Sequence, residues 1–146
     1  MPDFPDLPAL VLRAATQLID AIQDGVVERG FTDVRPSHGF AFARISAGDA
    51  TASDLADHLG VTKQAAGQLV DQLVERGYVT REPAPTDARA RLLQLTDKGW
   101  ACTRAADDAA REAVARWQQQ LDPATFAALG TALRTVITPG GLRPSW

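Results

Sequence analysis

The stretch Asp54–Gly99 decides the fold, and it reads DLADHLGVTKQAAGQLVDQLVERGYVTREPAPTDARARLLQLTDKG. Thr51 and Asp54 fit a capping box, so we expect a helix that begins after Thr51 and ends at Leu59, before a glycine. Thr62 is the expected N-cap of a second helix that extends to about Arg76. Two helices joined by so tight a break, with a hairpin after them, are typical of a winged helix-turn-helix that reads a DNA major groove.

The hairpin is predicted from two stretches that alternate like strands, Tyr78–Glu82 and Arg91–Leu95. The eight residues between them, Pro83–Ala90, are expected to form a protruding loop, because proline cannot donate to a strand ladder. An Asp-Ala-Arg tip at residues 87–89 gives this loop a cationic end.

Long helical patterns flank this region on both sides. Apolar residues recur at helical spacing from Ala9 to Arg29, and Pro36 is well placed to open a helix through about Ser46. Another helix is expected from Thr96 to about Gln120, and the Asp122-Pro123 pair starts a last one that ends before the Pro-Gly-Gly at residues 139–141.

The predicted fold class is therefore mainly α, with one small β-hairpin. We expect a single domain over residues 1–146, in which residues 36–99 form a winged helix-turn-helix lobe. The remaining helical segments, residues 9–30 and 98–138, are expected to form a helical base.

Composition limits the function further. The chain has 146 residues, one cysteine and a formal net charge of −3, and it shows neither a signal peptide nor an apolar run of membrane-spanning length. We therefore expect a cytoplasmic protein that has no contact with a membrane. Residues 62–91 hold five cationic and four anionic side chains, so any DNA contact depends on a few placed groups and helix N-termini.

Residues 51–99 resemble the winged helix-turn-helix core of the multiple-antibiotic-resistance-regulator (MarR) family. The motifs that carry the resemblance are LADHLGVTKQAAGQLVDQLVERGYV and TDARARLLQLTDKG, the second being the more specific. The resemblance implies a bacterial or archaeal transcriptional regulator, and more finely a ligand-responsive repressor that binds a palindromic operator. It also implies that the helical base joins two copies of the chain. We expect no cofactor and no enzymatic activity.

Candidate DNA-binding residues lie on the second helix and on the wing. Gln64, Gln68 and Gly67 are expected against base edges, because Gln can bond an adenine bidentately and glycine lets the backbone approach closely. The groups expected on phosphates or in the minor groove are Thr62, Lys63, Arg89 and Arg91, and the resemblance implies that Asp87 orients the wing by pairing with an arginine. The plain alternative for each is a solvated surface or a weak ion pair.

The chain departs from the family where arginines are common in the recognition helix. Gly67, Gln68 and Gln72 occupy those positions, so we expect a shallower salt dependence of DNA binding. This departure keeps a second hypothesis open, in which the chain is a dimeric ligand-binding or protein-interaction module with little DNA affinity.

Three aromatic or imidazole side chains are candidates for an effector pocket, namely His38, Phe42 and Trp100, with plain core packing as the alternative for each. The two histidines and Cys102 show no metal-ligand spacing, so we expect no metal site. No phosphate loop, nucleophile elbow or paired acid site occurs, which excludes the common enzyme classes that carry such motifs.

Overall fold

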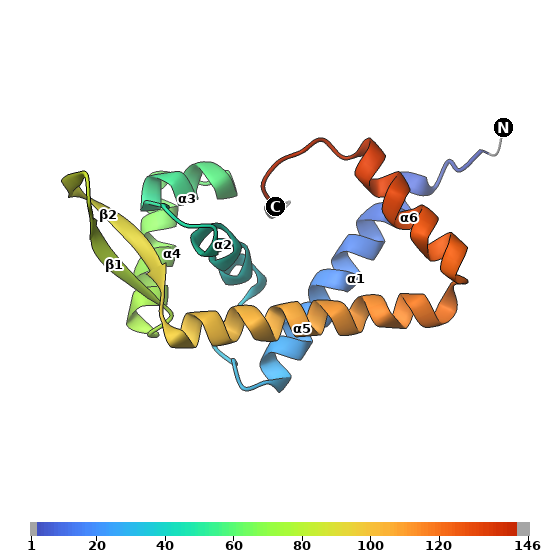
Figure 1. Cartoon of the computed structure of the whole chain (residues 1–146), viewed down its shortest axis with the longest axis horizontal. Coiled ribbons are helices and arrows are strands. Elements are labelled where there is room, and N and C mark those ends of the chain that lie inside the picture. Colours follow the sequence, from blue (N-terminus) through green and yellow to red (C-terminus); the bar gives the residue numbers. More distant parts are fainter. Residues whose placement is uncertain (1–2, 143–146) are drawn as a thin grey trace. The chain divides into compact units, whose positions relative to one another are not determined.

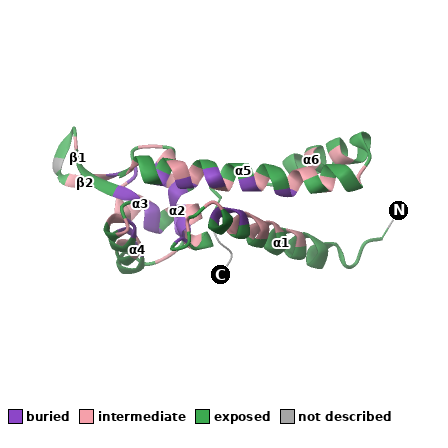
Figure 2. Ribbon diagram, turned by 90° about the horizontal axis from the view of Figure 1, so that it is seen from below, coloured by how far each residue is buried: buried purple, intermediate pink, exposed green. Residues whose placement is uncertain are grey.

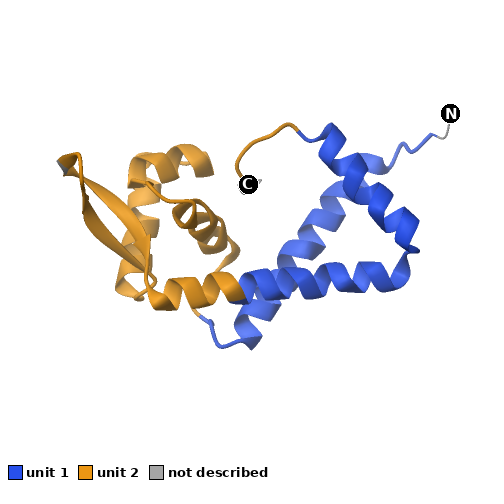
Figure 3. Cartoon of the chain, in the orientation of Figure 1, with its two compact units in different colours: residues 1–32, 105–137 blue, residues 33–104, 138–146 orange. Residues whose placement is uncertain are grey.

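A computed structural model of the protein describes residues 3–142 and divides the chain into two compact units (Figure 3). We call residues 33–104 with the segment from 138 onward the winged unit. Residues up to 32 together with 105–137 are the helical unit. Each unit is described by itself.

The winged unit holds three helices and a hairpin, followed by the first two turns of a fourth helix (Figure 1). In chain order these are α2 (Pro36–Ser46), α3 (Ala52–Leu59), α4 (Lys63–Glu75), β1 (Val79–Ala84), β2 (Asp87–Leu95) and the start of α5 (Asp97–Gln120). The predicted class, mainly α with a two-stranded antiparallel hairpin, is confirmed.

The helix-turn-helix forms through the caps that the sequence predicts. The Thr51 hydroxyl accepts a hydrogen bond from the Asp54 N–H at 3.2 Å, and the Asp54 carboxylate accepts one from the Thr51 N–H at 2.9 Å. Gly60 ends α3 with a φ of 70°, a left-handed conformation that glycine adopts without strain. The Thr62 hydroxyl then accepts from the Ala65 N–H at 3.1 Å and fixes the first turn of α4.

The hairpin differs from the expected long loop. β1 extends to Ala84 and β2 begins at Asp87, so the eight-residue loop predicted between the strands is wrong. Pro83 pairs with Arg91. A two-stranded sheet permits this proline because the outer edge of each strand has no neighbouring strand, so a missing N–H there costs no hydrogen bond. Ala84 pairs with Asp87, so the register shifts and residues 88–90 form a bulge in β2.

The core of the winged unit is built from every one of these elements (Figure 2). The Leu93 N–H of β2 donates to the Ala50 carbonyl at 2.8 Å, which ties the hairpin to the chain before α3. The rings of Phe42 and Tyr78 pack at 5.5 Å between centroids. The largest fully buried side chains of the unit are Tyr78, Leu55, Leu73, Leu93, Val70, Val79 and Cys102.

The helical unit contains α1 (Leu7–Glu28), the rest of α5, and α6 (Pro123–Val136). α1 and α5 approach closely, since a Cβ added at Gly25 would lie 2.5 Å from the Ala109 Cβ. The Arg29 guanidinium donates to the Glu112 carboxylate at 2.7 Å across the same contact. The buried side chains of this unit are small apart from that of Val26, so the two helices pack backbone to backbone.

Many of the larger apolar side chains of the helical unit are exposed. Leu12 is 66% exposed and Val136 is 76% exposed, values far from those of a core. The others, on the N-terminal segment, α1, α6 and the residue after α6, are Phe4, Leu7, Leu10, Val11, Val27, Leu129, Leu133 and Ile137. None of the helices among the described residues is both long and apolar enough to cross a membrane.

Candidate nucleic-acid interface

α4 presents a polar face that is free of bulky apolar groups. Lys63, Gln64 and Gln68 are exposed on it, and Gly67 is half-buried. Apart from the adjacent residues and the backbone of α4 itself, no atom lies within 4 Å of the position that a Cβ at Gly67 would take, so the backbone there is open to a close approach. Amide side chains on an open helix face can donate to and accept from base edges at once.

The N-terminus of α4 adds a site for an anion. The Thr62 hydroxyl oxygen accepts from the Ala65 N–H, which leaves its own hydroxyl proton able to donate to a phosphate. The first N–H groups of a helix have no intrahelical partner and carry a partial positive charge. Lys63 follows directly and is exposed, so this end of α4 suits a phosphate oxygen.

The tip of the hairpin extends beyond the helices of the winged unit (Figure 1). Arg89 and Arg91 are both exposed on β2, and Arg89 lies within the bulge. The Asp87 carboxylate accepts from the Arg89 backbone N–H at 2.9 Å. Among the described contacts Asp87 therefore fixes the backbone of the tip, rather than pairing with an arginine side chain as the resemblance implies.

An ion pair that sequence reasoning missed connects the wing to α4. The Arg81 guanidinium of β1 donates to the Asp71 carboxylate of α4. Because Asp71 is an anion on the exposed side of α4, this pairing reduces its repulsion of a phosphate. The sequence contains these two opposite charges ten residues apart, on either side of a turn. It does not show that they meet, because that depends on the packing of the strand against the helix.

The three candidates for an effector pocket differ in how far they are exposed to solvent. His38 and Phe42 are each 2% exposed in the core of the winged unit, whereas Trp100 on α5 is 42% exposed. The Nδ1 atom of His38 accepts from the Arg35 backbone N–H at 2.9 Å, and its Nε2 lies 3.4 Å from the Gln72 Oε1. Burial lowers the pKa of His38, against a smaller opposing effect of the Gln72 hydrogen bond.

A polar cluster at the C-terminal end of α4 was also missed. The Tyr78 hydroxyl donates to the Asp33 carboxylate at 2.6 Å, and the Arg76 guanidinium donates to the Asp33 carbonyl at 2.6 Å. The Lys98 ammonium donates to the Arg76 carbonyl at 2.8 Å and lies 4.3 Å from the Tyr78 ring centroid. The Tyr78 hydrogen bond lowers the pKa of Asp33, while burial raises the pKa of Tyr78, so the carboxylate stays the acceptor.

Cys102 is buried in the same unit, and burial raises the pKa of its thiol to about 11. The thiol is therefore protonated at neutral pH, which makes it a poor nucleophile and a poor metal ligand. Over the described part of the chain, no group of three or more His, Cys, Asp or Glu side chains is placed to hold a metal ion.

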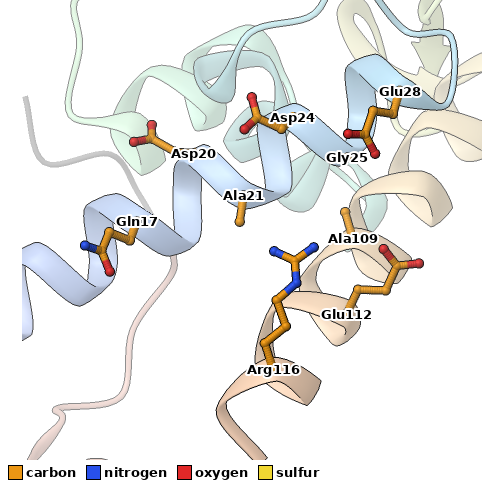
Figure 4. A pocket seen from close by; sticks show the side chains of 9 residues that line it. All are labelled: Gln17, Asp20, Ala21, Asp24, Gly25, Glu28, Ala109, Glu112 and Arg116. Carbon is orange, nitrogen blue, oxygen red and sulfur yellow. The ribbon is translucent and has the colours of Figure 1, made fainter. Parts of the chain in front are cut away.

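A cavity of about 330 Å³ lies in the helical unit between α1 and α5 (Figure 4). Its polar lining is mostly acidic, with the Arg116 guanidinium as its basic group. The lining residues are Gln17, Asp20, Ala21, Asp24, Gly25, Glu28, Ala109, Glu112 and Arg116. No sequence motif indicated this cavity, because its walls come from two helices that lie far apart in the sequence.

Comparison with known proteins bears on this geometry. A model described as the MarR family matches residues 30–90, the part that contains α2, α3, α4 and most of the hairpin. The resemblance to the MarR family is thereby confirmed over residues 30–90. No curated protein matches this MarR-like chain by sequence.

Solved structures of MarR proteins share the fold over nearly the whole chain. Apo wild-type MarR from E. coli is 22% identical with a TM-score of 0.75, covering 94% of this chain and 100% of its own. RV1404 from Mycobacterium tuberculosis is 26% identical with a TM-score of 0.78, over 92% of this chain and 93% of its own. A cysteine-to-serine mutant of E. coli MarR in complex with operator DNA is 22% identical with a TM-score of 0.70, over 94% and 100% of the two chains. The chain thus shares the fold of these solved structures.

Proposed function

We propose that the protein is a transcriptional regulator that binds double-stranded DNA as a homodimer and represses genes behind a palindromic operator. The observation that carries the proposal is the joint exposure, within one compact unit, of the polar face of α4 and the arginine-bearing wing. A similar fold in complex with operator DNA supports it. Such a regulator acts in the cytoplasm of a bacterium or archaeon and needs neither a cofactor nor a catalytic group.

Each exposed group has a distinct role in this proposal. Gln64 and Gln68 read base edges in the major groove, with the open backbone at Gly67 allowing α4 to lie close. Thr62 and Lys63 bind a phosphate at the start of α4. The Arg89 guanidinium enters the minor groove, Asp87 holds the tip in shape, and Arg91 binds the backbone.

The dimer follows from the apolar side chains that the helical unit leaves in solvent. Ten large apolar residues of this unit are exposed, far beyond the scattered apolar residues of an ordinary monomer surface. A second copy that covers α1 and α6 would remove them from water. Two-fold symmetry then places two α4 helices in successive major grooves, about 10 base pairs apart.

A small-molecule effector is part of the proposal, since the family resemblance implies one. An effector that reached His38 or Phe42 would have to displace core side chains, because both are 2% exposed. Trp100 is accessible without such a displacement. Effector binding at His38 or Phe42 therefore requires a second arrangement of the winged unit, whose population the effector would raise.

The test is binding of the purified protein to short duplexes from the region upstream of its gene, followed by fluorescence anisotropy. We expect preference for one palindrome and a log–log salt slope of about −5, from three phosphate-range cations in each of two protomers. Arg89→Ala is expected to weaken binding about tenfold on every sequence, whereas Gln68→Ala changes the preference among sequences. Arg111→Ala is the control, because that arginine belongs to the helical unit and its side chain is 76% exposed.

Salt-independent binding without sequence preference would contradict the proposal. Failure of the wild-type protein to bind any upstream duplex at low salt would favour the other hypothesis, a ligand-binding or protein-interaction module. The modest net charge of residues 62–91 and the glutamines at positions 68 and 72 make that outcome worth measuring.

A further inference from the structure

His38 is a buried imidazole with both ring nitrogens engaged. Its Nδ1 lies 2.9 Å from the Arg35 backbone nitrogen, at the start of α2, and its Nε2 lies 3.4 Å from Gln72 on α4. The ring is only 2% exposed, so water cannot replace either partner. His38 thus connects the first turn of α2 to the helix that carries the proposed base-reading residues.

The Arg35 N–H fixes the tautomer of this ring. A backbone N–H can only donate, so Nδ1 must be unprotonated and the ring proton lies on Nε2. Nε2 therefore donates to the Gln72 Oε1, which turns the NH2 group of that amide away from His38. Gln72 is exposed and lies four residues beyond Gln68, on the same row of α4, so its amide donors extend the polar face.

We propose that neutral His38 is a positioning residue that holds the start of α2 and the Gln72 amide in the arrangement that binds DNA, and that protonation of its ring disrupts this arrangement. The inference rests on the proposed DNA-binding function. It adds a pH-dependent element that neither the polar face of α4 nor the wing would supply.

Protonation has a specific consequence at this ring. A proton on Nδ1 would face the Arg35 N–H, so two donors would oppose each other at 2.9 Å and one must move. The charged groups that act on the ring are Arg35 and Asp33 on the segment before α2 and Arg76 at the end of α4. Two cations against one anion do not favour an imidazolium, and burial disfavours it further.

The experiment measures the affinity of the full-length protein for the duplex that it binds best, from pH 7.5 to pH 5.0 at constant ionic strength. We expect the wild-type affinity to fall on acidification, by up to about tenfold per pH unit for each protomer, because one proton is linked to binding. His38→Asn is expected to flatten this profile, since an amide oxygen can accept from the Arg35 N–H and does not titrate.

His58→Gln is the matched control, because the chain has only two histidines and this one lies on α3. Its profile should match that of the wild-type protein. A His38→Asn profile as steep as that of the wild type would overturn the inference and leave the proposed function intact. Wild-type protein that binds no duplex at pH 7.5 would instead overturn the proposed function, and this inference with it.

A second readout reports on the ring without DNA. Long-range proton–nitrogen NMR spectra of the free protein at pH 7.5 should assign the Nε2–H tautomer to His38. The His38→Asn variant identifies its signals by their loss. A signal from the Nδ1–H tautomer, or from an imidazolium at that pH, would overturn the inference.

Discussion

The winged unit buries most of its large apolar side chains, whereas the helical unit leaves many of its own exposed. Leu73 and Val70 of the winged unit are 0% exposed, whereas Leu12 and Val136 of the helical unit are 66% and 76% exposed. The first unit completes its hydrophobic core within one chain. The second buries chiefly glycine and alanine, so most of the apolar burial available to it depends on another surface.

The largest expected effect comes from a charge on the exposed apolar face. Leu10→Asp should convert the proposed dimer to a monomer at micromolar concentration, because the two-fold interface would bury two unpaired carboxylates, each at about 3–5 kcal/mol. Light scattering coupled to size-exclusion chromatography measures the mass. Leu10→Met keeps the apolar volume and should remain dimeric. A wild-type protein that runs as a monomer would show that this face has another role.

Shortening an apolar side chain should affect stability differently in the core of the winged unit and on the exposed face of the helical unit. Leu73→Ala should lower the free energy of unfolding by about 2–5 kcal/mol, because a fully buried leucine leaves a cavity. The loss should not depend on protein concentration. Leu133→Ala, at a side chain 37% exposed in one chain, should instead destabilise the protein in a concentration-dependent manner. Denaturant titrations at two protein concentrations distinguish the cases, and equal concentration dependence of both variants would contradict the contrast.

The close contact of α1 and α5 gives a smaller effect. Gly25→Ala should cost about 1–3 kcal/mol, because the new Cβ would lie 2.5 Å from the Ala109 Cβ and the helices must separate. Gly130→Ala on α6 is the matched control, since its nearest contact would be an arginine side chain at 3.6 Å. That substitution should be neutral or stabilising by helix propensity. Thermal unfolding of both variants tests the pair.

The smallest expected effect is that of a substitution that should change stability and DNA affinity in opposite directions. Gly67→Ala should stabilise α4 by about 1 kcal/mol, because nothing lies near the added methyl group. The same methyl group should weaken DNA binding if α4 approaches a duplex closely at this point. Unfolding and anisotropy measured on one preparation give both numbers. A more stable variant with unchanged affinity would remove Gly67 from the proposed interface.

The sequence predicts the helical skeleton well because its signals are local. The Thr51–Asp54 capping box, Thr62 and Asp122 cap three helices within three residues, and all three caps form as expected. α1 begins two residues before the predicted Ala9, since proline fits the first turn of a helix. The hairpin was predicted too short, because the rule against proline in strands does not apply to the outer edge of a two-stranded sheet.

Contacts between residues far apart in the sequence could not be predicted from local sequence patterns. Helix spacing predicts that Gln68 is exposed and the nearness of Arg89 to the hairpin tip predicts the same for it, and both are exposed. The ion pair of Arg81 with Asp71, the contact of His38 with Gln72 and the closeness of Gly25 to Ala109 each require the register of packed elements. No pattern within a single helix or strand contains that information.

The bulge in β2 determines how the hairpin tip can change in length between related sequences. Residues 88–90 have no partner in the ladder, while the pairs from Pro83–Arg91 to Val79–Leu95 remain in regular register below them. Insertions or deletions at the bulge would therefore lengthen or shorten the reach of the arginine without shifting any side chain of the hairpin stem to the opposite face. The length of the hairpin tip can therefore change while the folding of the stem stays unchanged.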